Sequence, residues 1–306
     1  MQKKIAVFIP CYNASRTIAE TIVSVKASVA RAYSEVPVYI YDDCSTDNST
    51  TVAGETWGEA PGLIIRRNAV NQGERKTTND AFNYFYGKYD WILIIHADDI
   101  VKPEWLPELY DQIEKAEEDR FFTVWSSFDA LDNETKTVTG GDDTGLIRTW
   151  DRTDAEKKYF ITKLYCSWHI SGAAFNVGLY RQLNGFDTTM PQFGDTDFYA
   201  RGLLAGYKDI YIARTLTVYR VIANSVSSTS VKTNRDIREG LYLLNKFNPV
   251  FDRLQLRAMC KSILQLSARR CFRWFLQLKM SNFLFCLKVT FNLSLKYLQT
   301  YGKVHS

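Results

Sequence analysis

The chain has 306 residues, of which 46% are hydrophobic and 24% charged, a balance typical of a folded globular protein and not of a disordered or fibrous one. The net charge of +4 is unevenly distributed. Residues 251–306 contain ten Lys or Arg against the single acid Asp252, whereas residues 1–250 carry a net charge of −5. The six cysteines have no paired spacing, which favours reduced thiols over a disulfide framework or a zinc site. No apolar run approaches the ~18 residues of a membrane span, and the N-terminus lacks a signal-peptide pattern, so we expect neither.

Short apolar runs alternate with helical patterns along the first part of the chain. The runs predict strands at residues 5–9, 36–41, 63–65 and 91–95, and the helical patterns lie at 14–30, 74–86 and 105–116. Strands and helices that alternate at this spacing indicate βαβ units and a mostly parallel sheet flanked by helices, which is an α/β fold. Further on, we expect strands at 121–128 and 218–222 and a helix at 195–205. The composition changes near residue 225, which predicts one domain at 1–225 and a helical, basic region at 226–306.

Polar side chains follow the first two predicted strands. Pro10 ends the first strand, Tyr12 offers a ring to a base, and Asn13 can cap the next helix. Asp42 and Asp43 follow the second strand, where a carboxylate can accept the imide N–H of uracil or thymine, or the N–H groups of guanine. An ordinary strand-to-helix turn is the alternative for the first segment. The Gly-rich fingerprints of dinucleotide and NTP sites are missing from the sequence.

Asp98 and Asp99 follow the fourth predicted strand. Ligands of open α/β sheets bind at the carboxyl ends of strands, and two adjacent carboxylates repel each other unless they share a cation. A metal-bound, phosphate-bearing ligand is therefore one interpretation. A solvated turn is the other, since Asp is common in turns.

The order of these motifs resembles that of the family 2 glycosyltransferases, which have the GT-A fold. The resemblance covers roughly residues 3–220 and extends beyond the strand ends to turns and a helix in the second half. The motifs that carry it are Pro10–Asn13, Asp42–Asp47, Asn71–Gly73 with Asn79, Ala97–Asp99 with Pro103, Gly185–Asp187 and Gly194–Arg201.

The resemblance implies a binding site for a nucleotide-sugar and a metal. Residues 10–13 and Asp43 would hold the nucleobase, Asp98 would contact the ribose or sugar, and Asp99 would bind Mg²⁺ or Mn²⁺. His96 stands where the family often has a further Asp, so either a nucleotide contact or simple packing is open for it.

The resemblance also implies a catalytic base, Asp195, in a position where the family usually has a Glu-Asp pair; here Gly194 replaces the Glu. One base without an enzyme nucleophile implies a single displacement with inversion at the anomeric carbon. Arg75 follows the turn at 71–73, where a cation can reach the diphosphate, although a solvated helix face would also explain it. Trp168 could stack on an acceptor sugar and His169 could bond its hydroxyl, with a purely structural role as the alternative.

The C-terminal region combines Leu, Phe and Trp with spaced Arg and Lys, a composition typical of a segment attracted to anionic lipid. Its period is ambiguous, and we favour helix. Packing on the catalytic domain or a dimer contact is the alternative, and we expect no nucleic-acid binding. This places the protein in the cytoplasm, peripheral on the inner face of the membrane.

The sequence therefore predicts a metal-dependent, inverting glycosyltransferase that uses a nucleotide-sugar, UDP before dTDP or GDP, and a glycan or lipid-linked glycan acceptor. A non-catalytic homologue that binds nucleotide-sugar or serves as a scaffold is the alternative. A sugar-nucleotide pyrophosphorylase is a weaker one, because residues 10–15 lack the Gly-rich, basic loop that it needs.

Overall fold

The protein is described from a computed structural model, which covers residues 2–32, 35–117, 120–132, 134–150, 169–222 and 226–301. The chain forms two compact units. Of the described residues, the first unit contains those between 2 and 150, 169–189 and 201–222, and the second contains 190–200 and 226–301. Because residues 190–200 group with the C-terminal helices, a single cut of the chain near residue 225 does not separate the two units.

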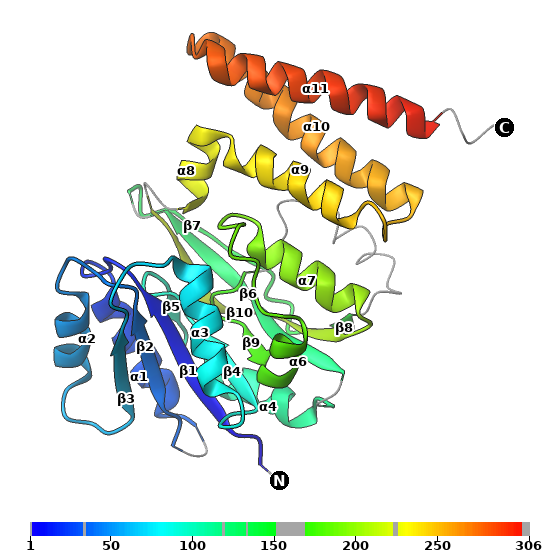
Figure 1. Cartoon of the computed structure of the whole chain (residues 1–306). Helices are drawn as coiled ribbons and strands as arrows, with labels where there is room; N and C mark the ends of the chain where they lie inside the picture. The colour runs from blue at the N-terminus through cyan, green and yellow to red at the C-terminus, as the bar shows by residue number, and fades with distance from the viewer. Residues whose placement is uncertain are drawn as a thin grey trace. The chain divides into compact units, whose positions relative to one another are not determined.

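Within the residues that the structure describes, the first unit is built around one sheet with ten strands (Figure 1). In chain order the strands are β1 (Ile5–Cys11), β2 (Val38–Asp42), β3 (Leu63–Arg67), β4 (Trp91–Ile94), β5 (Ile100–Val101), β6 (Phe121–Asp132), β7 (Val138–Thr139), β8 (Ile147–Trp150), β9 (Ala174–Asn176) and β10 (Lys208–Val221).

The order along the sheet is β3-β2-β1-β4-β9-β6-β10-β5, with β7 paired to β6 and β8 to β10. The first four strands are mutually parallel, as the βαβ pattern predicts. The sheet becomes mixed in its second half, because β9 runs antiparallel to both β4 and β6, while β6 and β10 are parallel. The α/β class is confirmed. The order β2-β1-β4 sets the carboxyl ends of three strands side by side at one edge of the sheet.

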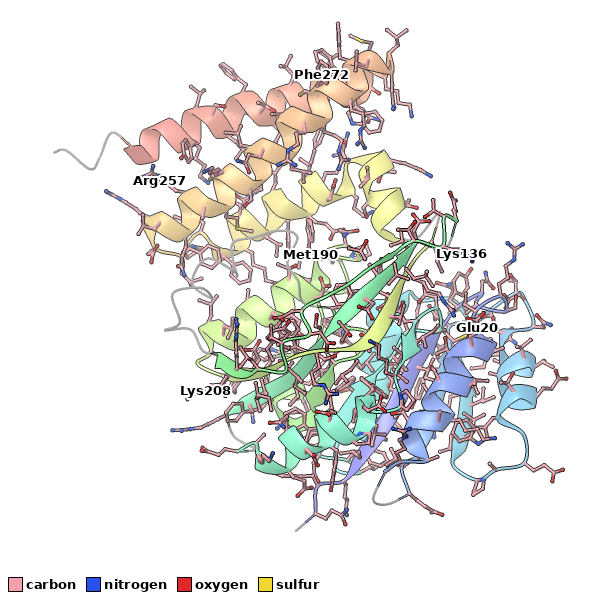
Figure 2. The ribbon with its side chains drawn as sticks, turned by 180° about the vertical axis from the view of Figure 1, so that it is seen from behind. Glu20, Lys136, Met190, Lys208, Arg257 and Phe272 are labelled. Carbon is pink, nitrogen blue, oxygen red and sulfur yellow. The ribbon has the colours of Figure 1, made fainter. Side chains whose placement is uncertain are left out.

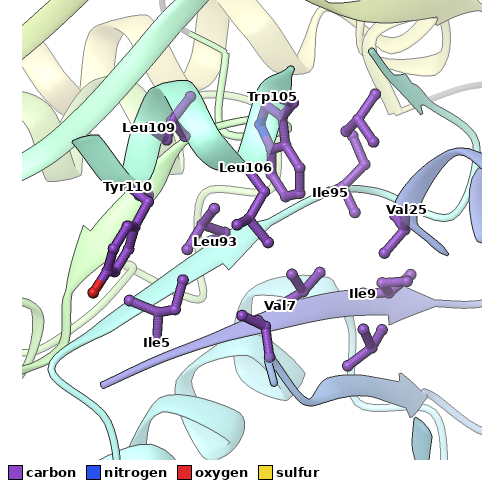
Figure 3. Close-up of a cluster of buried hydrophobic side chains, with 14 of the residues drawn as sticks. Ile5, Val7, Ile9, Val25, Leu93, Ile95, Trp105, Leu106, Leu109 and Tyr110 are labelled. Atoms are coloured by element: carbon purple, nitrogen blue, oxygen red, sulfur yellow. The ribbon is translucent and has the colours of Figure 1, made fainter. Parts of the chain in front are cut away.

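Helices cover both faces of this sheet, which explains why every residue of β1 is buried. The helices of the first unit are α1 (Ile18–Val29), α2 (Ser49–Trp57), α3 (Glu74–Phe85), α4 (Trp105–Lys115) and α6 (Val177–Gln182). On one face, Val7 and Ile9 of β1 join Leu93 of β4 and the α4 residues Trp105 and Leu106 in a single apolar core (Figure 3). The alternate residues of the same strands point to the opposite face.

The opposite face of the sheet is aromatic. Phe8 of β1 packs edge-to-face against Phe85 of α3, with ring centroids 5.9 Å apart. Phe82 of α3 stacks on Tyr180 of α6 at 3.8 Å. Such pairs add about 0.5–1.5 kcal/mol each beyond the area they bury, so α3 is held firmly against the sheet. The residue before α3 is Gly73, the last residue of the Asn71–Gly73 motif.

The second unit is helical in the residues that the structure describes. It contains the first part of α7 (Gly194–Leu204), then α8 (Val226–Thr233), α9 (Arg235–Phe247), α10 (Arg253–Leu276) and α11 (Met280–Tyr301). A capping box formed by Asp252 and Gln255 starts α10, and Arg257 and Phe272 lie towards its opposite ends (Figure 2).

Polar contacts tie α10 to α9 and α11. A buried ion pair joins Arg270 of α10 to Asp236 of α9 at 2.6 Å, and Ser267 of α10 donates to the carbonyl of Cys286 in α11. The helical period that we favoured for the C-terminal region is thus observed. Among the described helices, no stretch is long and apolar enough to span a bilayer.

Candidate active site

Three potential metal ligands gather in the turn that follows β4. His96, Asp98 and Asp99 each offer one ligand atom, and these atoms all lie within 4.8 Å of one another. The turn is closed by a hydrogen bond from the Asp99 N–H to the His96 carbonyl at 3.1 Å. The His96 N–H donates to Ser171 Oγ at 3.0 Å, which anchors the turn to the segment before β9. Asp98 and Asp99 therefore lie at the carboxyl end of a central strand, as predicted.

Asp99 is only 1% exposed. Its Oδ1 accepts a hydrogen bond from the backbone N–H of Arg220 in β10 at 2.9 Å, while Oδ2 has no hydrogen-bond partner within the described part of the chain. Burial raises the pKa of Asp99 above its usual range, although His96 and Ser171 act in the opposite direction. Burial and the Asp99 carboxylate likewise raise the pKa of Asp98. A cation between the two carboxylates would remove this penalty.

Glu74, the first residue of α3, faces the same group. Its Oε1 lies 3.4 Å from His96 Nε2 and 3.3 Å from Arg75 Nη1, so one carboxylate oxygen contacts both the imidazole and the guanidinium. Burial alone would lower the pKa of His96, but the Glu74 carboxylate outweighs it and raises that pKa to about 9. Burial would raise the pKa of Glu74, yet Arg75 and His96 hold it well below its usual value.

The donor set fits a divalent cation. The Oδ2 atom of Asp99 is buried and has no hydrogen-bond partner in the part of the chain that the structure covers, whereas His96 Nε2 faces the Glu74 carboxylate at 3.4 Å. Buried polar atoms normally have a partner, so Asp99 Oδ2 is available to a ligand. His96 would bind a metal only as neutral imidazole, after losing the proton that Glu74 stabilises. Carboxylates are ligands of Mg²⁺ and Mn²⁺, and imidazole is a common ligand of transition metals. His96 thus belongs to the candidate metal group, a role that differs from the nucleotide contact and the packing that the sequence left open.

Asp43 organises the loop that leads into α3. Its carboxylate accepts three hydrogen bonds, from Asn68 Nδ2 at 2.9 Å, from the Gln72 N–H at 3.0 Å and from the Gly73 N–H at 2.7 Å. Gly73 has a φ of +88°, a conformation that favours glycine. The loop at 68–73 is therefore folded around the carboxylate that the sequence assigns to the nucleobase.

The end of β1 is connected to the end of β2. Pro10 pairs with Tyr41 in the parallel register, and the N–H of Asn13 donates to Ser45 Oγ at 2.9 Å. Asn13 has a φ of +48°, and its side chain accepts from the Thr46 N–H. It does not make the helix cap that we predicted, because α1 begins only at Ile18 without a side-chain cap. Tyr12 is 51% exposed, so its ring is accessible.

Asp42 is buried below this turn and binds protein groups. It accepts hydrogen bonds from both the N–H and the hydroxyl of Ser45, and Arg67 Nε lies 3.4 Å from its Oδ2. The two adjacent acids at the end of β2 therefore have separate roles: Asp42 fixes the turn after β2, and Asp43 fixes the loop before α3.

Arg75 is not a solvated charge on the surface of α3. It is 8% exposed, contacts Glu74, and lies over the ring of Phe186 with 5.0 Å from the guanidinium carbon to the centroid. Lys76, the next residue, instead forms an exposed i,i+4 pair with Asp80. Through the shared Glu74 oxygen, the structure brings Arg75 close to the metal-ligand group.

Of the two predicted acceptor residues, Trp168 lies outside the described residues. The ring of His169 contacts Tyr219 of β10 at 4.4 Å and lies 6.2 Å from the ring of His96, centroid to centroid. Its Nδ1 is 3.2 Å from the carbonyl oxygen of Ser171. His169 is thus brought to the candidate metal group.

Asp195 belongs to the second unit, where it is the second residue of α7 and accepts a hydrogen bond from the Thr196 N–H at 2.8 Å. The segment before it is fixed by α9. The Glu239 carboxylate accepts from the N–H groups of Gln192 and Phe193 at 3.0 and 2.8 Å, and Lys246 pairs with the buried Asp197 at 2.7 Å. These contacts hold the start of α7.

Sequence reasoning did not single out three residues around Asp99 and His96. Arg220 contributes only its backbone N–H to Asp99, which no sequence motif reveals. Ser171 lies in the small-residue turn after His169, a weak signal. Glu74 directly follows the Asn71–Gly73 motif, so that motif was the available indication.

Comparison with known proteins assigns the family. The model of "Glycosyl transferase family 2" matches residues 6–182. An uncharacterized glycosyltransferase of Nostoc sp., alr2836, is 30% identical over 135 residues, which are 44% of this chain and 39% of that protein. Glycosyltransferase GlyG of Streptococcus pneumoniae is 24% identical over 132 residues, which are 43% of this chain and 42% of GlyG. The matches thus span about two fifths of these curated relatives.

Solved structures share the fold. S. aureus TarS 1-349 in complex with UDP-GlcNAc aligns with a TM-score of 0.61 at 14% identity, over 92% of this chain and 89% of that one. The mannosyltransferase PcManGT from Pyrobaculum calidifontis, in complex with GDP-Man and Mn²⁺, aligns with a TM-score of 0.57 at 15% identity, over 97% and 88%. The GT-A-like fold expected from the sequence is confirmed. Since the family match also covers more than half of the chain, this protein belongs to the family 2 glycosyltransferases.

Proposed function

We propose that this glycosyltransferase moves a sugar from a UDP-sugar to a hydroxyl of a glycan or lipid-linked glycan, with a divalent cation and with inversion. The observation that carries the proposal is the group of His96, Asp98 and Asp99 at the end of β4, beside the strand ends of β1 and β2. Residues at the end of β4 would bind the metal, and residues 10–13 and Asp43 at the ends of β1 and β2 would bind the nucleobase.

The hydrogen bonds of Asp43 support a uracil or thymine base over guanine. A carboxylate has about four acceptor positions, and three are used by Asn68, Gln72 and Gly73. Among the described residues no further group donates to it, so one position is left, on Oδ2, which matches the single imide N–H of uracil or thymine. Guanine presents two adjacent N–H donors on the corresponding edge and would leave one of them without a partner there. The TarS structures with UDP-GlcNAc and UDP agree with this choice, whereas PcManGT was solved with GDP-Man.

The diphosphate would lie beside a cationic group. A divalent cation bound by Asp99, beside His96 and Asp98, would neutralise charge that develops on the nucleoside diphosphate as it leaves. Asp99 is the ligand we assign first, because its buried Oδ2 has no other partner among the described residues, and Asp98 is assigned to the ribose or sugar. Arg75 adds a second, buried cation next to Glu74.

We assign the proton transfer to Asp195. As the acceptor oxygen bonds to the anomeric carbon, the bond from that carbon to the phosphate oxygen breaks, and the hydroxyl proton passes to the Asp195 carboxylate. The ordinary pKa of an Asp, about 4, is sufficient because the hydroxyl becomes acidic only as the new bond forms. A single displacement of this kind inverts the anomeric configuration. His169 and Trp168 are the residues we assign to the acceptor.

The partner that we propose for residues 251–306 is an anionic membrane surface, which would place the enzyme at the inner face of the membrane, close to a lipid-linked acceptor. The support is the excess of basic residues in this segment, with Asp252 as its single acid.

Thermal melting with nucleotides tests the donor site. UDP with Mn²⁺ should raise the melting temperature more than dTDP, GDP or CDP, and a chelator should abolish most of the shift; ligand at 100 times its Kd adds about 2.7 kcal/mol. UDP release from UDP-sugars then tests catalysis. Asp195→Asn should retain the UDP shift and lose transfer, while Asp111→Asn, an exposed acid on α4, should match the parent. Nucleotide binding without any transfer by the parent would favour the non-catalytic alternative.

A further inference from the structure

Helix α11 has two apolar faces. Cys286, Val289 and Leu293 are buried, and their neighbour Thr290 donates to Ser267 of α10, so this face packs within the helical unit. A second set of apolar residues recurs at intervals of four, three, four and four residues, which keeps them on one side of a helix. We call this set the outer stripe: Met280, Leu284, Leu287, Phe291 and Leu295.

The outer stripe is open to solvent in the described structure. The exposed fractions of its five side chains lie between 46% and 63%. With about 100° of rotation per residue, the stripe lies on the opposite side of α11 from Cys286, Val289 and Leu293. Phe275 at the end of α10 and Leu278 in the turn before α11 are exposed as well, and Phe275 contacts Phe283 of α11 with ring centroids 5.6 Å apart. Contiguous exposed apolar surface of this extent commonly marks an interaction site.

The charges around the stripe favour anionic lipid as its occupant. Lys288 is exposed on α11 and Lys279 is exposed in the turn before it, and no Asp or Glu occurs after Asp252. A second copy of the chain packed on the stripe would bring these lysines against each other. An anionic membrane surface instead offers phosphates to the lysines and acyl chains to the leucines, in the manner of an interfacial amphipathic helix.

We propose that α11 lies in the plane of an anionic membrane, with the outer stripe among the acyl chains and Lys279 and Lys288 at the phosphates. This deepens the proposed function and rests on it in one respect, namely that a lipid-linked acceptor would be held in the same membrane. A helix of 22 residues at about 1.5 Å per residue is roughly 33 Å long, which gives a long, shallow contact.

Vesicle binding of the full chain tests the proposal. Co-sedimentation is measured with phosphatidylcholine vesicles that contain a quarter phosphatidylglycerol, and with vesicles of phosphatidylcholine alone. The parent should bind the anionic vesicles, and less strongly at high salt. Leu287→Gln with Phe291→Gln should weaken binding at least ten-fold. The matched control, Val250→Gln with Leu254→Gln, removes two exposed apolar side chains outside the stripe and should stay within two-fold of the parent.

Three results would overturn the proposal: no binding of the parent to anionic vesicles, equal binding by the stripe variant, or a parent dimer in light scattering that the stripe variant dissociates. The last result would make a second copy the occupant. No nucleotide is used, so vesicle binding can succeed or fail independently of the transferase reaction. The UDP-induced melting shift of each variant, measured in parallel, confirms folding and reports the donor site separately.

Discussion

Asp43→Asn is the most informative single substitution for the donor site. It keeps the size of the side chain but replaces one acceptor oxygen by an NH₂ group. In either orientation of the amide, its NH₂ group faces an N–H donor of the loop. If it replaces Oδ2, the Gly73 N–H loses its acceptor, and if it replaces Oδ1, Asn68 and Gln72 lose theirs. The bonds that survive are made to a neutral oxygen and no longer to a carboxylate.

The cost can be worked out from these contacts. A hydrogen bond to a charged group contributes about 1.5–3 kcal/mol, and a buried group left unpaired costs about 1–3 kcal/mol. Losing one such bond and weakening the others should therefore destabilise the protein by about 2–4 kcal/mol. At roughly 2–4 °C per kcal/mol for a unit of this size, the melting temperature should fall by at least about 4 °C. UDP should also cease to shift it.

The assay is circular dichroism melting and urea unfolding of the parent, Asp43→Asn and the control Asp111→Asn. Amide hydrogen exchange at residues 68–73 shows where the loss occurs, because the loop should open more often when its central acceptor is impaired. A variant whose unfolding free energy lies within about 0.5 kcal/mol of the parent, the usual range of surface changes, would show that this carboxylate does not hold the loop.

Three further predictions concern stability. Because Glu74 raises the pKa of His96 from 6.5 to about 9, the pair stabilises the metal-free protein fully between about pH 4.5 and 6.5 and progressively less up to about pH 9. His96→Gln should flatten this fall in melting temperature. The pKa of Glu74 is lowered, so the dependence on pH runs in the opposite direction: the stability that the Glu74 carboxylate contributes is lost as the pH drops below 4.5, the usual pKa of a Glu. Gly58→Ala, at φ +72° with open space around it, should cost about 1 kcal/mol in urea unfolding. Gly185→Ala, at φ +63° and with a side chain against the added methyl group, should lower the unfolding free energy by about 1–3 kcal/mol more than Gly58→Ala does. Equal losses for the two variants would show that Gly185 is not closely packed. Trp105→Ala should cost about 3–5 kcal/mol by the same measurement, since the indole is fully buried.

The amino-acid sequence predicts those parts of the site that lie directly after apolar runs. A buried strand in a parallel sheet has a recognisable run, and its end points to the ligand edge, so the positions of Asp43, Asp98 and Asp99 follow from the pattern of residues alone. The βαβ half of the sheet follows from the same periodicity. The mixed half of the sheet could not be predicted in this way, because β9 has only three residues, which is too short for an apolar pattern to indicate a strand.

Contacts between distant segments could not be predicted. The Arg220 N–H that binds Asp99 comes from 121 residues away, and a backbone donor leaves no trace in the amino-acid sequence. The burial of Arg75 depends on Phe186, more than a hundred residues further on. Charged residues on a helix face are usually solvated, and only the packing of a remote ring distinguishes Arg75 from Lys76.

The contacts of α9 limit how far this enzyme can be rearranged by protein engineering. A catalytic fragment that ends at residue 225 would lack Lys246, the cation that pairs with the fully buried Asp197, and Glu239, which receives two backbone N–H groups just before Asp195. A buried carboxylate that loses its counter-ion is strongly destabilising. The C-terminal helices therefore cannot be exchanged on their own. In a chimera of two relatives, residues 190–200 and the C-terminal helices should come from the same parent.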